Sequence, residues 1–396
     1  RMGAVNVQFT PDGSWFVAPG PTPDSNFPAQ VWFYPLNHPY PDVWACFPDS
    51  SMPGQAKRGR GLGPKAFLPG GKRLIADVGY GELWLCDLFQ EDPRCRLLLR
   101  HPTKRYFEPP AFDAVGRYVV SGDIAGGRAW LVPLAGGEPR ILDGFDGVVV
   151  ATALSDDARF VAVGGFATRI DPPGALIRIW DLETNGTVDI ACGRQARPLR
   201  LDFLANTRLL EASEAGLRIW DVETGECDVL SERPHLMWGD IDSSKRFVVI
   251  DTHAGATLWD LQTRTERTLP IASAPLTCLA IAPDVSYVVG GNEDGSVVFV
   301  DLDENEPYIL RGHEEAVDVV QALPDEDRFM SASRDGYLRV WDRPQGAPLQ
   351  ARPLGELLEV LRAQTNMRIV LDVDADNGYR IEYDPFPGWE VAPTWQ

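Results

Sequence analysis

The chain has 396 residues and a formal net charge of −20. A molecule this acidic repels the phosphates of nucleic acids and the head groups of anionic lipids, so we expect no nucleic acid partner. No apolar run approaches the length of a membrane span, and we expect no membrane contact.

A short apolar run that ends in a two-residue stop recurs eight times along the chain. The stops follow one another, by subtraction, at intervals of 52, 46, 48, 40, 39, 41 and 41 residues. A nearly fixed period of about 40 to 45 residues is typical of a repeat array built from four-stranded units. The stops are Pro35, Asp87, Pro133, Asp181, Asp221, Asp260, Asp301 and Asp342.

The first unit is the most distorted. Residues 4–9 and 14–19 predict its first two strands, residues 31–36 its third strand and residues 43–47 its outermost strand. The next units repeat this order with more regular spacing. Their outer strands are predicted in residues 95–99, 139–144, 187–193, 226–230 and 266–270.

The last complete unit shows the pattern most clearly. Residues 316–323 predict a first strand, residues 328–333 alternate as a second, and residues 334–336 form a tight turn into residues 337–342. A sheet of this kind has two apolar faces and cannot stand alone. It must therefore stack on neighbouring sheets around a ring.

The period and the repeated Trp-Asp endings at Trp180, Trp220, Trp259 and Trp341 resemble the WD-repeat β-propeller family over residues 4–343. The resemblance implies an all-β fold, which we interpret as an eight-bladed propeller. Seven blades and a stray sheet are the alternative. The chain also looks similar to the propeller region of bacterial multidomain signalling or defence proteins.

The large aromatic residue of each unit changes its place between the early and late repeats. Trp32, Trp84 and Trp130 lie three residues before the stop, whereas the later tryptophans lie one residue before it. A shift of two residues keeps a side chain on the same face of a strand. We therefore expect every tryptophan to pack between the same pair of blades.

One polar set resembles the structural tetrad of the family: His313, Ser331, Asp335 and Trp341, with Gly312 before the histidine. The resemblance implies that the Asp bonds the His, the His bonds the Ser, and the Ser accepts from the indole. The same residue types could be misread as a hydrolytic triad. We favour the structural interpretation because buried polar groups must be paired.

Residues 346–396 depart from the repeat, so we place a propeller at 1–345 and a second domain at 346–396. Leucines at helical spacing predict a helix over residues 354–364. Residues 367–373 and 379–383 predict two strands of a hairpin with a turn at Asn377 and Gly378. We expect this helix, hairpin and aromatic tail to pack on the propeller.

Three insertions lengthen the early repeats, at residues 19–29, 48–64 and 166–175, and all three are expected on one rim of the ring. Loops on a rigid scaffold are where binding residues gather. The second insertion is rich in glycine and arginine but lacks the Lys-Ser/Thr ending of a phosphate-binding loop. The candidate partner-binding residues are Lys57, Arg58, Arg60, Lys65, Phe27 and Arg169.

The six cysteines are scattered and form no CxxC pair. We interpret them as free thiols of a reducing compartment, and we expect a cytoplasmic protein. Alternating Asp372, Asp374 and Asp376 lack the glycine and glutamate of a calcium loop, and the histidines lack zinc spacing. No metal or other cofactor is predicted.

Two functional hypotheses remain. The first is a non-catalytic scaffold, a regulatory or sensor ring that binds another protein such as a protease, a kinase or a nucleotide-driven switch protein. The second is a propeller enzyme of the metal-dependent hydrolase type that uses the central channel. The inner strands predicted at residues 4–9, 148–154, 276–282 and 316–322 are mainly apolar, with isolated Asn6 and Asp318. We favour the scaffold because a catalytic site needs convergent polar groups.

Overall fold

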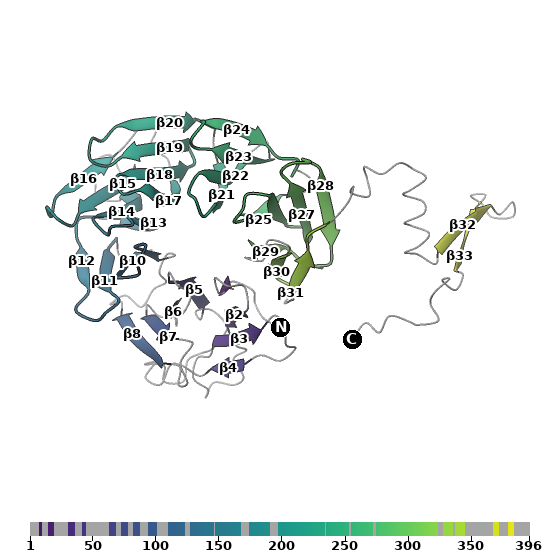
Figure 1. Ribbon diagram of the computed structural model, residues 1–396, viewed down its shortest axis with the longest axis horizontal. Helices are drawn as coiled ribbons and strands as arrows, with labels where there is room; N and C mark the ends of the chain where they lie inside the picture. The colour runs from purple at the N-terminus through teal and green to yellow at the C-terminus, as the bar shows by residue number, and fades with distance from the viewer. Residues whose placement is uncertain are drawn as a thin grey trace. The chain divides into compact units, whose positions relative to one another are not determined.

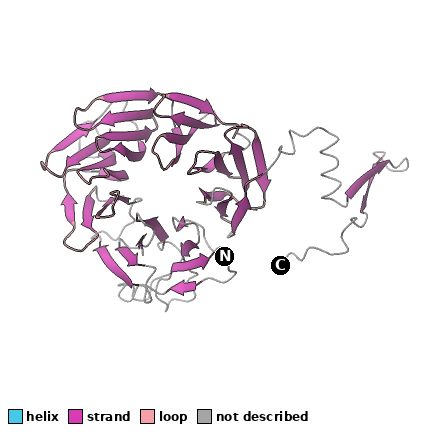
Figure 2. Ribbon diagram, viewed as in Figure 1, coloured by secondary structure: helices cyan, strands magenta, loops and turns pink. Residues whose placement is uncertain are grey.

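The computed structural model describes residues 8–9, 15–19, 31–35, 42–44, 63–68, 73–77, 82–87, 94–100, 110–122, 127–145, 147–167, 174–190, 197–233, 235–252, 255–271, 275–323, 328–335, 337–344, 367–371 and 379–383. Within these ranges the chain forms strands, turns and loops but no helix (Figure 2). Accordingly, no described segment is a helix long and apolar enough to cross a bilayer. The chain divides into two compact units, Arg1–Arg343 and Pro344–Gln396.

The strands of the first unit form antiparallel sheets, numbered here in chain order. Sheets 1 to 4 have four strands each: β1 (Gln8–Phe9), β2 (Trp15–Pro19), β3 (Val31–Pro35), β4 (Asp42–Trp44); β5 (Gly63–Phe67), β6 (Arg73–Asp77), β7 (Glu82–Asp87), β8 (Arg94–Arg100); β9 (Ala111–Phe112), β10 (Tyr118–Gly122), β11 (Ala129–Pro133), β12 (Arg140–Leu142); β13 (Gly147–Leu154), β14 (Phe160–Ala167), β15 (Gly174–Asp181), β16 (Thr187–Ile190).

Sheets 5 to 7 repeat this plan, and sheet 8 has three strands among the described residues. Their bounds are β17 (Pro198–Ala205), β18 (Arg208–Ser213), β19 (Gly216–Asp221), β20 (Cys227–Ser231); β21 (His235–Ile241), β22 (Phe247–Thr252), β23 (Gly255–Asp260), β24 (Thr265–Thr268); β25 (Leu276–Ile281), β26 (Tyr287–Asn292), β27 (Ser296–Asp301), β28 (Pro307–Arg311); β29 (Val317–Ala322), β30 (Arg328–Ser333), β31 (Leu338–Asp342).

The sheets follow one another around a common axis, and the first strand of each lies nearest that axis (Figure 1). All-β architecture is therefore confirmed, and the architecture is consistent with a WD-repeat propeller. Each of the eight predicted stops is the last residue of a third strand, from Pro35 at the end of β3 to Asp342 at the end of β31. The sequence period thus marks a real structural repeat.

Apolar clusters between neighbouring sheets hold the unit together. Trp180 packs with Val120 and Leu131 of sheet 3, and Trp259 packs with Leu210 and Ile219 of sheet 5. Trp130, at the earlier of the two Trp positions, likewise packs against sheet 2. Tryptophans at both spacings therefore contact the preceding sheet, as the two-residue period of a strand predicts.

The second unit is described only at two strands. β32 (Met367–Leu371) and β33 (Tyr379–Tyr383) pair antiparallel, with Met367 opposite Tyr383. This pairing matches the predicted hairpin strands. The predicted helix at 354–364, the turn at Asn377 and Gly378 and the aromatic tail lie outside the described residues.

One sequence prediction about the cysteines is wrong. Cys86 and Cys95 form a disulfide, with their Cα atoms 4.0 Å apart. They lie directly opposite each other on β7 and β8, which the short connection between these strands brings into register. The prediction considered CxxC spacing, whereas the two strands of a hairpin bring together cysteines nine residues apart. Of the other described cysteines, Cys278 is a free thiol.

Reduction of this disulfide is expected to lower the free energy of unfolding by about 2 to 3 kcal/mol, because the bond restricts a short loop of the unfolded chain. Urea denaturation with and without a reductant measures the change. A variant with Cys86→Ala and Cys95→Ala serves as the control and should not respond to the reductant. An unchanged wild-type midpoint would contradict a stabilising disulfide.

Candidate functional site

Four polar side chains around sheet 8 form a continuous chain of hydrogen bonds. The Trp341 indole Nε1 donates to Ser331 Oγ over 2.8 Å. Ser331 Oγ lies 2.7 Å from His313 Nε2, and His313 Nδ1 lies 2.9 Å from Asp335 Oδ2. The structure therefore brings together the four side chains that the family resemblance placed in a tetrad.

Burial sets the protonation of this tetrad. The His313 side chain is fully buried, and burial lowers the pKa of His313 against the opposing effect of Asp335. At neutral pH, His313 Nδ1–H therefore donates to Asp335, and Nε2 accepts from the Ser331 hydroxyl. Burial alone would raise the pKa of Asp335, but hydrogen bonds from the Tyr337 N–H, from His313 and from the Glu314 N–H lower it.

Ser331 is closed to any substrate. Its relative exposure is 0%, and its Oγ is held between Trp341 and His313. A catalytic serine needs the same histidine but must also reach a reacting carbonyl carbon. The geometry therefore braces β30 against β31 and leaves no room for nucleophilic attack.

Other sheets give their tryptophan a different partner. Glu211 occupies the fourth place of β18, as Ser331 does in β30, and accepts from Trp220 Nε1 over 2.8 Å. The buried Arg218 lies 3.7 Å from Glu211 and neutralises it. A charged residue inside an apolar second strand, visible in the sequence, indicates such a partner for the tryptophan. The prediction was restricted to the Ser and His of the family pattern and therefore missed it.

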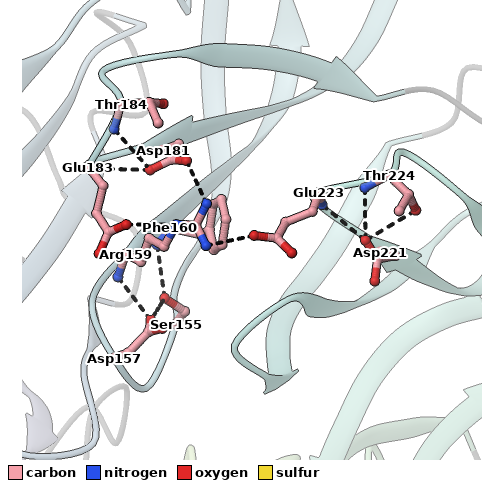
Figure 3. A network of polar contacts seen from close by, with 10 residues as sticks. All are labelled: Ser155, Asp157, Arg159, Phe160, Asp181, Glu183, Thr184, Asp221, Glu223 and Thr224. Carbon is pink, nitrogen blue, oxygen red and sulfur yellow. Dashed lines mark hydrogen bonds and ion pairs between the residues drawn. The ribbon is translucent and has the colours of Figure 1, made fainter.

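The aspartates at the strand stops accept a second set of hydrogen bonds (Figure 3). Asp181 accepts from the N–H groups of Glu183 and Thr184, which turns the chain after β15. Arg159 donates to Asp181 over 3.0 Å and to Glu223 of the next sheet over 2.6 Å. The hydrogen bond from Arg159 lowers the pKa of Asp181. This arginine therefore couples sheets 4 and 5.

The same device recurs in other sheets. Arg246 bonds Asp260 with Nε at 3.0 Å, and this contact lowers the pKa of Asp260 well below its usual range. Arg343, after β31, donates to Asp301 of sheet 7 over 2.7 Å. The aspartate stops are thus points where turns are capped and, in two places, where neighbouring sheets are joined.

A cavity of about 400 Å³ lies between β9, β13 and β17, the first strands of sheets 3, 4 and 5; we call it the axial cavity. Arg200 and Asp202 alternate along β17, so both point to the same side, with Nε and Oδ2 at 2.9 Å. Lys245, in the turn after β21, reaches Asp156 of sheet 4 at 2.9 Å. This second ion pair crosses from sheet 6 to sheet 4.

The first strands of sheets 5 and 6 were not among the strands on which the expectation of isolated polar residues rested, and they carry several charged residues. Besides Arg200 and Asp202, Asp240 lies on the first strand of sheet 6 and interacts electrostatically with both. Arg200 and Asp202 were visible in the sequence PLRLDFLA, two residues apart within an apolar run. They were missed because the strands that contain them were not weighed.

The Asp240 carboxyl group has a perturbed pKa. Burial raises the pKa of Asp240 to about 6, although hydrogen bonds from the Ile281 and Ile241 N–H groups and the charge of Arg200 act in the opposite direction. The bond to Ile281 joins sheet 6 to sheet 7. Asp240 is therefore a partly buried carboxyl group at the contact between two sheets.

A pH dependence of stability follows. Because the folded pKa of Asp240 is raised, its contribution to stability is complete below about pH 4 and is lost as the pH rises through about 6. The variant Asp240→Asn should therefore gain about 1 to 3 kcal/mol over the wild type between pH 4 and pH 7. Chemical denaturation of both proteins at each pH measures this difference, and a difference that does not change with pH would contradict it.

The candidate partner-binding residues fall largely outside the described residues. Lys57, Arg58, Arg60, Phe27 and Arg169 all lie outside the described ranges, as do most residues of the three insertions. Lys65 lies in β5. Their role in binding stays a prediction.

The described ranges hold no group of three or more His, Cys, Asp or Glu side chains arranged to bind a metal ion. The axial carboxylates Asp202 and Asp240 instead share the Arg200 guanidinium.

The repeat can now be assigned. Residues 305–342, which include β28 to β31 and the His313 tetrad, match the family model described as WD domain, G-beta repeat. This segment therefore matches a WD40 repeat. One protein whose name describes it as WD repeat-containing is similar to the chain over a longer stretch.

Three curated relatives illustrate the likeness. The serine-threonine kinase receptor-associated protein of Dictyostelium discoideum is 30% identical over 128 residues, covering 32% of this chain and 43% of that protein. Apoptotic protease-activating factor 1 of Mus musculus is 30% identical over 77 residues, covering 19% of this chain and 6% of that protein. The WD repeat-containing protein pop1 of Schizosaccharomyces pombe is 24% identical over 225 residues, covering 51% of this chain and 27% of that protein.

The chain therefore matches less than half the length of each of these relatives. All three are eukaryotic proteins. The expected likeness to bacterial signalling or defence proteins is not confirmed by them and stays a prediction.

Proposed function

We propose that this chain is a non-catalytic scaffold, an eight-bladed WD-repeat propeller that binds a protein partner and acts as a regulatory or sensor module. The observation that carries this proposal is the closed tetrad of sheet 8, in which the buried Ser331 holds Trp341. A set of residues that could have been a hydrolytic site instead connects strands. A buried polar network whose members are all paired makes the fold rigid. Rigid scaffolds typically carry the residues that bind other proteins on their loops.

The eight-bladed count rests on eight successive sheets in the first unit, each with a stop at the end of its third strand. Propellers enlarge by adding blades around one axis, so eight repeats suit one closed ring. We propose a bacterial setting on the sequence resemblance alone. We also propose a cytoplasmic location, for which the Cys86–Cys95 disulfide removes the support of the cysteine argument.

The relatives' names suggest classes of partner. One is associated with a kinase receptor, and another activates a protease. We propose a kinase, a protease or a nucleotide-driven switch protein as the partner. The basic insertion with Lys57, Arg58 and Arg60 is its proposed contact, because cations on a molecule of net charge −20 attract an acidic surface.

The test is capture of a partner from the native host, followed by reconstitution with the purified partner. Replacing Lys57, Arg58 and Arg60 with Glu should weaken the dissociation constant at least tenfold, equivalent to about 1.4 kcal/mol. The matched control carries the same three charge reversals at the exposed Arg233, Arg264 and Arg334. Equal binding by the two variants would exclude the insertion from the interface, and failure to reconstitute any specific complex would contradict the scaffold.

A further inference from the structure

Sheet 8 differs from the other sheets at its outer edge. Sheets 1 to 7 each have a fourth strand paired with the third, whereas among the described residues sheet 8 ends at β31 (Figure 1). Trp341 on β31 is partly exposed, although Trp180, Trp220 and Trp259 at the same place in sheets 4 to 6 are buried. The edge of a sheet presents a row of unpaired backbone N–H and C=O groups, to which a further strand can add.

The third strands of sheets 4, 5 and 8 share an arginine two residues before the tryptophan. Arg178 of sheet 4 donates to both carboxylate oxygens of Asp189, which lies directly opposite it on the outer strand β16. Arg218 of sheet 5 is instead matched by Glu211, which lies directly opposite it on the second strand β18. In both sheets a neighbouring strand therefore supplies a carboxylate to the arginine.

Arg339, the corresponding arginine of sheet 8, has no such partner among the described residues. The residue opposite it on β30 is Ser331, a neutral hydroxyl in the place of Glu211. Within the same ranges, the buried Nε of Arg339 has no hydrogen-bond partner. The Tyr337 ring, with its centre 5.8 Å from the guanidinium carbon, carries no charge. The second strand cannot supply the missing carboxylate, so it must come from a fourth strand.

The Arg339 side chain is placed as Arg178 is. Arg178 lies beside Gly144, whose carbonyl oxygen accepts a hydrogen bond from it, and Arg339 lies beside Gly312. Both glycines closely follow the outer strand of the preceding sheet. An acidic residue opposite Arg339 would therefore meet its guanidinium as Asp189 meets Arg178.

The sequence that follows β31 is poorly suited to supply this strand. It contains Pro344, Pro348 and Pro353 and has no acidic residue between Asp342 and Glu356. Proline has no N–H group to donate to a neighbouring strand. Residues 1–7 also contain no aspartate or glutamate.

We propose that the edge of β31 binds an extended acidic segment of a partner protein, which adds to sheet 8 as an antiparallel fourth strand and places an Asp or Glu opposite Arg339. Backbone hydrogen bonds supply affinity in such a strand addition, and the acidic side chain supplies specificity. The proposal rests on the proposed role as a protein-binding scaffold, but its contact is a sheet edge and not the basic insertion.

Fluorescence anisotropy of the full chain with labelled peptides tests the proposal. The probe is a capped peptide of sequence Gly-Thr-Val-Asp-Ile-Ala, which repeats residues 186–191 and so includes the outer strand of sheet 4. The control peptide has Lys in place of the Asp. We expect saturable binding of the Asp peptide and at least tenfold weaker binding of the Lys peptide.

Charge variants of the chain locate the site. Arg339→Glu should reverse the preference between the two peptides, and Arg339→Gln should abolish it. Arg233→Glu is the matched control, because it reverses an exposed arginine elsewhere, and it should bind the peptides as the wild type does. Reversing Lys57, Arg58 and Arg60 should also leave peptide binding unchanged, which separates failure of the basic insertion from failure of this edge.

Hydrogen–deuterium exchange of β31 adds a measurement that needs no variant. We expect the β31 amides that do not pair with β30 to exchange quickly in the free chain and slowly with the Asp peptide. Slow exchange in the free chain would show that the same polypeptide already covers this edge, and it would overturn the proposal. No saturable binding, or equal binding of the two peptides by the wild type, would also overturn it. If Arg339→Glu fails to fold, the wild type and Arg339→Gln still decide.

Discussion

Replacing Asp335 with Ala is expected to lower the free energy of unfolding by about 2 to 4 kcal/mol. The side chain of Asp335 is 5% exposed and accepts hydrogen bonds from His313 and from the N–H groups of Glu314 and Tyr337. Its removal leaves three donors without their acceptor in a largely buried place. Urea denaturation followed by tryptophan fluorescence measures the loss.

The matched control for this variant is Asp284→Ala. Asp284 also caps a turn, accepting from the Ser286 N–H and hydroxyl, but it is exposed to water, which can replace it. A loss of less than about 1 kcal/mol is expected there. Equal losses for the two variants would contradict a special bracing role for the tetrad.

Replacing Glu211 with Ala is expected to cost about 3 to 5 kcal/mol, because it leaves the buried Arg218 guanidinium without its carboxylate and the Trp220 indole without its acceptor. The double variant Glu211→Leu with Arg218→Met removes both charges and keeps most of the volume. It should be far less destabilised than the single variant, because no unpaired charge stays in the core. Both are compared by denaturation at pH 7.

The single variant is the control for the double variant, because both lack the Glu211 carboxylate and only the double variant also lacks the Arg218 charge. If the double variant were at least as unstable as Glu211→Ala, the pair would be contributing net stability. The interpretation that the unpaired Arg218 is the main cost would then be wrong.

The repeat could be predicted from the sequence because it depends on local features. Where a strand ends in an aspartate that caps the following turn, the apolar run and the aspartate can be recognised in the sequence. Asp181 and Asp301 are examples. The packing of Trp130 and Trp180 against the preceding sheet followed from the two-residue period of strands alone. These relations involve neighbours in the chain or a fixed period.

Contacts between sheets could not be predicted in the same way. Arg159 meets Glu223 and Lys245 meets Asp156, partners 64 and 89 residues apart, and neither pairing is marked by a motif. The disulfide between Cys86 and Cys95 depends on the register of two strands, which spacing rules for metal sites do not consider. The axial cavity likewise exists only once β9, β13 and β17 converge.

The central claim is that Ser331 is a buried structural residue that braces β30 against β31, and is not a nucleophile. Incubation of the folded protein with a fluorophosphonate probe, followed by intact-mass and peptide mass spectrometry, tests it most directly. We predict no adduct on Ser331 while circular dichroism shows the native fold. A stoichiometric adduct on Ser331 of the native protein, abolished by Ser331→Ala, would contradict the account.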